Sequence, residues 1–281
     1  MTVKEAVELF RSYQKSHVRE KTRQSYEYLI RNFEALFAEL TIEAISVEDV
    51  HQFLLIVTDG RAKSSARLRY AQLKAFFNFL IEAGKMLSNT CDDPALRRAF
   101  RAPRGKDRDV VPREVVDEVI YRCRKPRNRL IMELQARCGL RIGEVLHLRW
   151  CDVRERKLLL KNPKSGREEE AAFMPESIAN RVNGYMAGLG GSGEQRIFPI
   201  CYSTARAFIK KLGEKVNVKL RPHDLRRYSA TYASRNGIPL EVISKVILRH
   251  SDLKTTQICT WGRLPTLRRS GGSTRCTVSK S

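Results

Sequence analysis

The chain of 281 residues is 42% hydrophobic, long and apolar enough for two modest domains that each bury a core. Its 53 Lys and Arg residues against 31 Asp and Glu residues give a formal net charge of +22, which indicates a polyanionic partner, most often nucleic acid. No run of about 18 apolar residues occurs, so we expect no membrane-spanning helix. The seven Cys residues show no metal-ligand spacing, so we expect no metal.

The N-terminus and the cysteines indicate a reducing compartment. Residues 1–10 lack the basic, apolar and small-residue regions of a secretory signal peptide. The odd number of Cys residues, scattered along the chain, favours free thiols over a disulfide framework. We therefore expect a cytoplasmic protein, associated with the nucleoid if its polyanionic partner is DNA.

Amphipathic helices are predicted throughout residues 1–88. Thr2 and Glu5 have the spacing of a capping box, which opens the first helix, and apolar and aromatic residues then recur at helical spacing. The expected helices span residues 2–17, 20–40, 47–57 and 64–83. This pattern predicts a four-helix N-terminal domain with an aromatic core, in which basic residues of the fourth helix are candidates for a DNA-facing side.

The helical pattern fails between the two halves of the chain. Residues 89–111 hold Pro94, Pro103 and a run of basic residues, which predicts an extended basic linker. Residues 1–104 contain 17 basic and 13 acidic residues, net +4, whereas the remainder contains 36 and 18, net +18. We therefore expect the phosphate-handling residues in the second half.

Residues 112–260 combine predicted helices with one β-hairpin. Pro112 opens this second domain, as a proline at a first helical position does. The expected helices before residue 221 span 113–124, 127–138, 142–148, 175–186 and 203–216. Residues 157–161 and 167–174 have the pattern of two strands around a turn. Residues 261–281 are polar, basic and poorly periodic, which predicts a disordered tail.

The segment 221–260, RPHDLRRYSATYASRNGIPLEVISKVILRHSDLKTTQICT, concentrates residue types that bind phosphate. Pro222 can start a helix on which His223 and Arg226, three residues apart, share one face. An imidazole and a forked guanidinium there could meet a single phosphate, although a basic helical hairpin on a solvated surface is the alternative. A second helix leads into His250. Its predicted apolar side consists of Leu240, Val242, Ile243, Val246, Ile247 and Leu248.

The runs HDLRRYSAT and ILRHSDLKTTQ together resemble the tyrosine recombinase (phage integrase) family, of the Xer-like kind. A third run, ARCGLRIGE, is similar to the family motif that carries its first catalytic Arg. The resemblance implies a mainly α protein with a small β-hairpin or sheet. Residues 1–88 would form a helical, SAM-like core-binding domain, and residues 112–260 an α+β catalytic domain. The catalytic residues that the resemblance implies are Arg141, Lys164, His223, Arg226 and His250.

The resemblance also implies a reaction and its partners. The family recombines or integrates double-stranded DNA at specific sites by strand cleavage and rejoining, through a 3′-phosphoprotein intermediate. It uses no cofactor, metal or small-molecule substrate, and its protomers act as a homo-oligomer, a tetrameric synapse on DNA. Two arginines would neutralise the non-bridging phosphate oxygens, and Lys164, or Lys161 as second choice, would protonate the leaving 5′-oxygen.

The family's nucleophile is a Tyr nine residues beyond the last His, and Cys259 occupies that position here. A Cys sulfur lies about 2.8 Å from its Cα and a Tyr oxygen about 6.5 Å, a shortfall of roughly 3.5–4 Å. Three hypotheses stay open. The protein is a recombinase whose own nucleophile is lost, a non-catalytic DNA-binding or accessory protein, or an enzyme. Such an enzyme would use Cys259, or would nick and rejoin DNA like a type IB topoisomerase.

Overall fold

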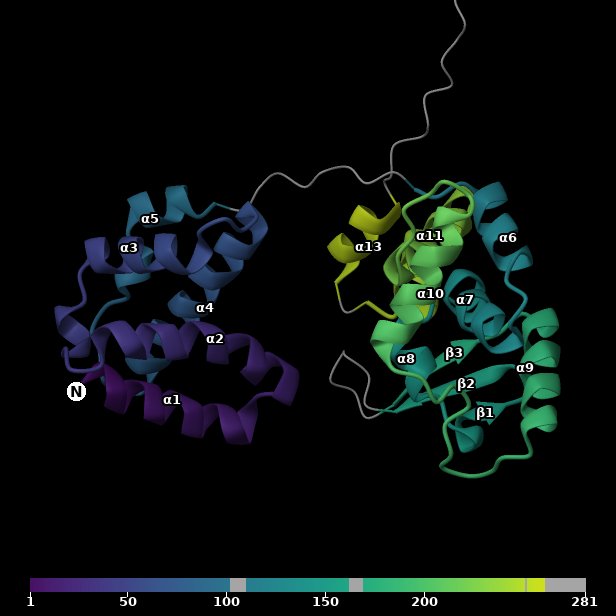
Figure 1. Ribbon diagram of the computed structural model, residues 1–281, viewed down its shortest axis with the longest axis horizontal. Coiled ribbons are helices and arrows are strands. Elements are labelled where there is room, and N and C mark those ends of the chain that lie inside the picture. The colour runs from purple at the N-terminus through teal and green to yellow at the C-terminus, as the bar shows by residue number, and fades with distance from the viewer. Residues whose placement is uncertain (102–109, 162–168, 251, 261–281) are drawn as a thin grey trace, which may run out of the picture. The chain divides into compact units, whose positions relative to one another are not determined.

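The chain divides into two compact units, Met1–Lys106 and Asp107–Ser281. The computed structural model describes residues 1–101, 110–161, 169–250 and 252–260. Helices build the first unit, and helices around a small sheet build the second (Figure 1). The predicted fold class, mainly α with a small sheet, is confirmed. Within those described ranges no helix is long and apolar enough to span a membrane, and no three His, Cys, Asp or Glu side chains form a metal-binding group.

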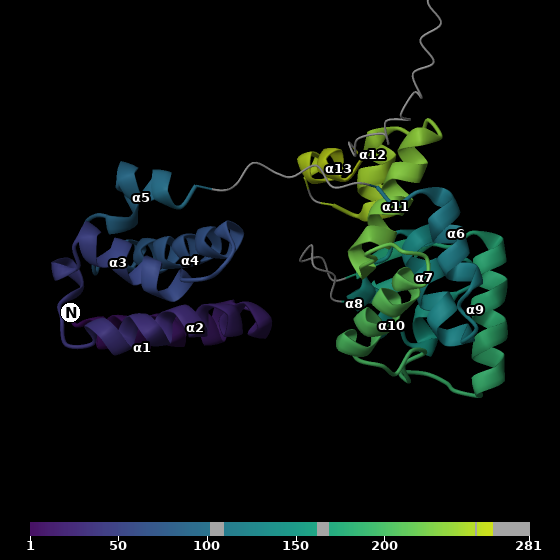
Figure 2. The ribbon, with the colours of Figure 1, turned by 45° about the horizontal axis from the view of Figure 1, so that its top comes forward.

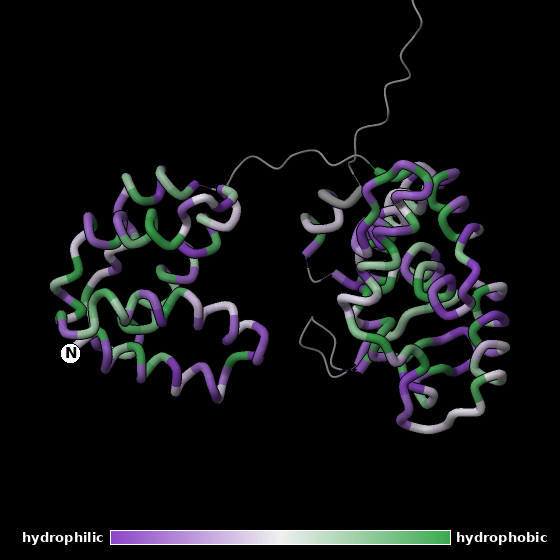
Figure 3. Tube along the Cα trace, viewed as in Figure 1, coloured by the Kyte–Doolittle hydropathy of each residue, from purple (hydrophilic) through white to green (hydrophobic). Residues whose placement is uncertain are grey.

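Four helices of the first unit match the four predicted ones. They are α1 (Val3–His17), α2 (Glu20–Phe37), α3 (Val47–Thr58) and α4 (Lys63–Glu82), with the short η1 (Ile42–Ala44) between α2 and α3. The predicted capping box opens α1: Thr2 N donates to Glu5 Oε2 (2.9 Å), and Glu5 N donates to Thr2 Oγ1 (3.2 Å). Hydrophobic and hydrophilic residues are interspersed along these helices (Figure 3), and each helix buries the apolar stripe of its surface.

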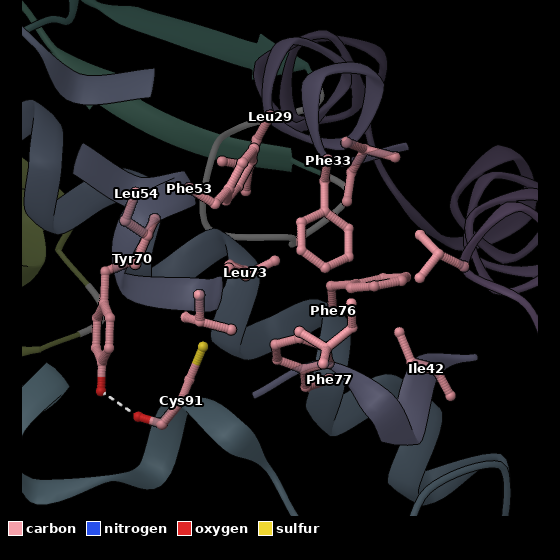
Figure 4. Close-up of a cluster of buried hydrophobic side chains, with 14 of the residues drawn as sticks. Leu29, Phe33, Ile42, Phe53, Leu54, Tyr70, Leu73, Phe76, Phe77 and Cys91 are labelled. Atoms are coloured by element: carbon pink, nitrogen blue, oxygen red, sulfur yellow. Dashed lines mark hydrogen bonds between the residues drawn. The ribbon is translucent and has the colours of Figure 1, made fainter. Parts of the chain in front are cut away.

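Aromatic side chains fill the centre of the first unit. Phe33 of α2 makes edge-to-face contacts with Phe53 and Phe76, whose ring centroids are 5.1 and 6.0 Å away. All three rings are buried (Figure 4). The hydroxyl of the buried Tyr70 donates to the carbonyl oxygen of Cys91 at 2.7 Å, so the polar end of that ring is satisfied.

The predicted linker over residues 89–111 differs from the structure in its first part. Two short helices lie there, η2 (Thr90–Asp92) and α5 (Pro94–Ala99). Cys91 and Leu96 are buried in the core of the first unit, so burial of these apolar side chains holds the segment against that unit. Pro94 occupies the first turn of α5, where a backbone N–H has no partner within the helix, so the lack of one does not destabilise the helix. Residues 102–109 of the predicted linker lie outside the described residues. At its end, Val110 is buried and Val111 packs against an apolar cluster of the second unit.

Helices of the second unit pack around α7 and α11. The elements are α6 (Arg113–Tyr121), α7 (Pro126–Cys138), α8 (Ile142–His147), η3 (Trp150–Asp152), α9 (Glu176–Leu189), α10 (Tyr202–Glu214), α11 (Pro222–Arg235), α12 (Leu240–Val242), the π-helical turn η4 (Ile243–Leu248) and α13 (Leu253–Thr260). Helix α11 packs against α7 on one side and against α13 on another, and α12 also contacts α13 (Figure 2). The predicted disordered tail, residues 261–281, lies outside the described part of the chain.

Three antiparallel strands form one sheet in the order β1–β2–β3. They are β1 (Val153–Arg154), β2 (Lys157–Lys161) and β3 (Glu169–Phe173). Leu158 pairs with Ala172, and Leu160 pairs with Glu170, so four buried side chains, one of them a carboxylate, share a face. Strands β2 and β3 confirm the predicted hairpin, whereas its turn falls within residues 162–168, outside the described residues.

The apolar helix predicted before His250 divides into α12 and the π turn η4. Ile243 and Leu248, five residues apart, are buried, whereas Val242 and Val246 are 42% and 45% exposed. The prediction that both valines face the core is wrong. A π turn closes each hydrogen bond over five residues, so the buried positions repeat at a wider interval than in an α-helix.

Candidate active site

A pocket of about 520 Å³ gathers basic residues from separate segments of the second unit. Arg141 contributes from the N-terminus of α8, and His223 and Arg226 from the start of α11. His250 contributes from the turn that follows η4. The other lining residues are Gln135, Ile142, Tyr202, Pro222, Arg249 and Thr255. Four of the predicted site residues therefore line one pocket although they are far apart in the sequence.

The turn at Gly139 anchors two arginines that line this site. Gly139 ends α7 with φ 63°, and a Cβ there would lie 2.8 Å from both Cγ2 and the carbonyl oxygen of Ile247. Only glycine fits, because both the backbone angle and the space exclude a side chain. The carbonyl oxygen of Gly139 accepts hydrogen bonds from Arg226 Nη1 and from Arg249 Nη2 (3.4 Å). The turn therefore fixes two guanidinium groups at once.

The carboxylate of Glu144 lies among three arginines. Its Oε1 accepts from Arg141 Nη1 (2.6 Å), and its Oε2 accepts from Arg141 N (2.8 Å) and from Arg249 Nη2 (2.8 Å). Burial acts to raise the pKa of Glu144, but the charge of Arg249 and the hydrogen bonds from Arg141 outweigh it and lower that pKa. Glu144 therefore stays ionised and offsets part of the positive charge.

The guanidinium of Arg226 is held mainly by backbone carbonyl groups. Arg226 is 2% exposed, and it donates to the carbonyl oxygens of Gly139 and Leu248. Its Nη1 lies 3.9 Å from Glu144 Oε2, farther than the guanidinium of Arg249. Carbonyl oxygens orient a guanidinium without cancelling its charge, so Arg226 adds positive charge to the lining of the pocket.

His250 is a neutral imidazole at the edge of this positive cluster. Its Nδ1 lies 3.0 Å from Oγ1 of the buried Thr256 on α13, which fixes the ring. Burial first, and then the charges of Arg226 and Arg141, lower the pKa of His250 to about 4. An anion that entered the pocket would oppose that repulsion and raise the pKa, so both ring nitrogens of His250 can become donors when a phosphate is bound.

Most of the chain matches known protein-family domains. Residues 110–260 match the phage integrase family, and residues 7–84 match the N-terminal SAM-like domain of phage integrases. This chain belongs to the phage integrase family. Tyrosine recombinase XerA of Saccharolobus solfataricus is 33% identical over 155 residues, 54% of this chain and 52%, about half, of that protein's length. Tyrosine recombinase XerA of Thermococcus kodakarensis is 28% identical over 224 residues, 75% of this chain and 76% of that protein.

Solved structures of integrases share this fold. A lambda integrase dimer bound to a COC′ core site has a TM-score of 0.75 at 18% identity and covers 100% of both chains. The Tn1549 transposon integrase in complex with a circular intermediate DNA has a TM-score of 0.73 at 16% identity, covering 92% of this chain and 94% of that chain. At such low identity the likeness concerns the fold.

Three further predicted site residues are not among the described residues that line the pocket. Lys164 lies outside the described residues. Lys161, the second choice, ends β2 with its Nζ 3.3 Å from Glu194 Oε1 and 3.7 Å from Asp152 Oδ1, and it does not belong to the described lining of the pocket. Cys259 lies in the last turn of α13, and its side chain is outside the described part of the chain.

Sequence reasoning missed Arg249 and Glu170. Arg249 is 6% exposed and lines the pocket, and Glu170 is buried on β3. The one sequence signal was the acidic run at 168–170, which is unusual on a hairpin of a strongly basic protein. The role of Glu170 depends on Arg249, which lies about eighty residues further along the chain, so no local pattern could have identified it.

Proposed function

We propose that this protein is by descent a DNA strand transferase of the tyrosine-recombinase type, built to recombine or integrate double-stranded DNA at specific sites, and that its own nucleophile is lost at Cys259. The observation that carries the proposal is the pocket in which Arg141, Arg226, His223 and His250 meet. Support also comes from relatives named tyrosine recombinases, from similar integrase structures that hold DNA, and from the net charge of +22.

Each pocket residue has a chemical role in this proposal. Arg141 and Arg226 bind the two non-bridging oxygens of the scissile phosphate and neutralise the charge that develops in the transition state. His250 donates a further hydrogen bond to the phosphate. His223, exposed at the start of α11, exchanges the proton of the nucleophile. Lys164, which lies between β2 and β3 in the sequence, protonates the leaving 5′-oxygen.

The domain organisation follows from the same proposal. Residues 1–88 act as the core-binding domain and residues 112–260 as the catalytic domain, and together they clamp a duplex. Protomers assemble on DNA as a tetrameric synapse, and the protein works in the cytoplasm at the nucleoid, with residues 261–281 as a basic tail. Duplex binding should weaken steeply as salt is added, because phosphate contacts release counterions. Salt-insensitive affinity contradicts the clamp.

Cys259 takes the place of the nucleophile in this proposal, and its short side chain withholds in-line attack. The test is covalent trapping on a nicked duplex that carries the recombination site, with denaturing electrophoresis as the readout. Wild-type protein should give no adduct. Cys259→Tyr should give one, because a phenol at this position extends about 3.5–4 Å farther from the backbone. Cys259→Ser serves as the matched control of similar size.

Two results would change the assignment. An adduct with the wild-type protein that disappears in Cys259→Ser makes the thiol the nucleophile and the native protein an active enzyme. No adduct with any variant, on a duplex that the protein binds, favours the second candidate, a non-catalytic DNA-binding or accessory protein. Cys259 is the observation that favours this candidate. Relaxation of supercoiled plasmid without recombination would identify type IB topoisomerase-like activity.

A further inference from the structure

Arg249 adopts a backbone conformation that side-chain-bearing residues rarely take. Its φ and ψ are both 51°, in the left-handed region, where glycine is favoured. The residue is nevertheless 6% exposed, so its long side chain is folded into the protein rather than into solvent. A strained conformation persists only where surrounding contacts hold it, and here the guanidinium makes those contacts.

The guanidinium of Arg249 makes contacts on three sides. Nη2 donates to Glu144 Oε2 at 2.8 Å and to the carbonyl oxygen of Gly139 at 3.4 Å. Nη1 donates to the carbonyl oxygen of Ile247 at 2.9 Å. The side chain therefore joins its own turn to the turn before α8, which carries Arg141.

Glu170 lies on the remaining side of this guanidinium. Its Oε2 is 3.6 Å from Arg249 Nε, an ion-pair distance that is longer than a hydrogen bond. Neither atom has a hydrogen-bond partner among the described residues. Glu170 is buried on the same sheet face as the apolar Leu160 and Ala172, where an unpaired carboxylate is costly. Arg249 is therefore the cation that allows Glu170 to be buried there.

We propose that Arg249 is a positioning residue that bridges Glu144 and Glu170 and keeps Glu144 from forming a closer ion pair with Arg226. Arg249 Nη2 lies 2.8 Å from Glu144 Oε2, whereas Arg226 Nη1 lies 3.9 Å from the same oxygen. Without Arg249, Glu144 turns to Arg226 and neutralises the charge that the phosphate needs. The bridge also ties β3 to the turn that ends in His250. The part of this inference that concerns phosphate rests on the proposed function.

The test begins with Arg249→Gly, because glycine accepts φ 51° without strain and removes the guanidinium. The melting temperature should fall, because Glu170 loses its cation. The Kd for a labelled duplex of mixed sequence should rise about tenfold, and the slope of log K against log salt should drop by about 1, because one phosphate contact is lost. Lys245→Gln removes the same charge from an exposed site on η4 and should leave all three values unchanged.

The double variant Arg249→Gly/Glu170→Gln separates positioning from simple structural support. Neutral Gln removes the orphaned charge, so the melting temperature should recover. The Kd should stay raised, because Glu144 still holds Arg226. Recovery of both values together would make Arg249 a structural residue only and overturn the inference, as would a single variant without effect on Kd.

A second variant covers the case in which Arg249→Gly does not fold. Arg249→Lys keeps the charge but lacks the fork that spans two carboxylates, so Kd should rise about threefold. An unchanged Kd overturns the inference. Failure of the proposed function is distinguishable, because wild-type protein would then show no salt-dependent duplex binding. The melting temperatures would still test the bridge between Arg249 and Glu170 without DNA.

Discussion

The two units hold their centres together in opposite ways. The first unit buries apolar and aromatic side chains, such as Phe33 and Phe76, together with a few neutral polar groups, among them the hydroxyl of Tyr70. The second unit also has apolar clusters, but beside them it buries Arg226, Arg249 and carboxylates. Apolar packing depends on volume and loses stability in proportion to the atoms removed. The stability of a buried charge cluster depends on every charged partner, because the loss of one partner leaves the opposite charge buried and unpaired.

The largest expected effect tests the apolar centre. Phe33→Ala should lower the free energy of unfolding by about 3–5 kcal/mol, because it removes a ring that packs on several others. Urea denaturation followed by circular dichroism measures this loss. Leu36→Ala on the same helix, at a side chain that is 53% exposed, is the control and should cost less than about 0.5 kcal/mol. Equal losses in the two variants would contradict the described core.

The sequence predicted the first centre better than the second because helical periodicity is local. The spacing of Phe33 and Phe76 within their own helices was enough to predict a buried face. The same reasoning failed at Cys91 and Leu96, because a three-residue helix and a six-residue helix are too short to show a period. Their burial comes from contact with residues far along the chain.

The candidate site was predictable only through its resemblance to a known family. Spacing placed His223 and Arg226 on one face, but nothing local linked them to Arg141. The bridge from Arg249 to Glu170 was out of reach, because charged residues in turns and hairpins are usually solvated. Glu144 and Glu170 both pair with Arg249, which is far from each of them in the sequence. Their roles therefore depend on the folded structure and cannot be predicted from a local sequence pattern.

The second prediction compares two glycines with the same backbone angles. Gly139 and Gly190 both have φ 63° and ψ 26°, but only at Gly139 would a Cβ approach Ile247 within 2.8 Å. Gly190→Ala should cost about 1 kcal/mol from the left-handed conformation alone. Gly139→Ala should cost about 2–4 kcal/mol, because crowding is added to the strain.

Thermal unfolding of both alanine variants measures the difference. Gly139→Ala should also weaken duplex binding, since the carbonyl oxygen that holds Arg226 must move. Gly190→Ala should bind as the wild type does. Equal destabilisation of the two would show that the turn at Gly139 accommodates a methyl group, and the packing between Gly139 and Ile247 would not be as tight as described.

A third, smaller effect concerns one polar contact in the apolar centre. Tyr70→Phe removes the hydroxyl that donates to the Cys91 carbonyl oxygen and should cost about 1 kcal/mol, because that buried acceptor loses its donor. Urea denaturation measures the loss, and Tyr13→Phe, at a ring that is 42% exposed, is the control without an expected effect. A loss as large as that of Phe33→Ala would show that polar contacts matter as much in the first unit as in the second.

The smallest expected effect is a pH dependence at His250. The pKa of this imidazole is lowered to about 4 in the folded protein, first by burial and then by the arginines. Because its ordinary pKa is 6.5, the unfolded chain takes up the proton first, so this contribution to stability is present above pH 6.5 and is lost as the pH falls toward 4. The imidazole is half-buried, and solvent screening reduces the effect between pH 7 and 6 to a fraction of about 1 kcal/mol.

Titration of the imidazole by NMR measures this pKa in the protein with and without duplex DNA. The free protein should titrate well below 6.5, and bound DNA should raise the pKa, because phosphate charge offsets Arg226 and Arg141. DNA binding should then take up protons near pH 5, which calorimetry in buffers of different ionisation enthalpy detects. His250→Gln should remove that uptake. If the pKa of His250 in the free protein is the ordinary 6.5, the positive charges around the imidazole are already balanced without DNA.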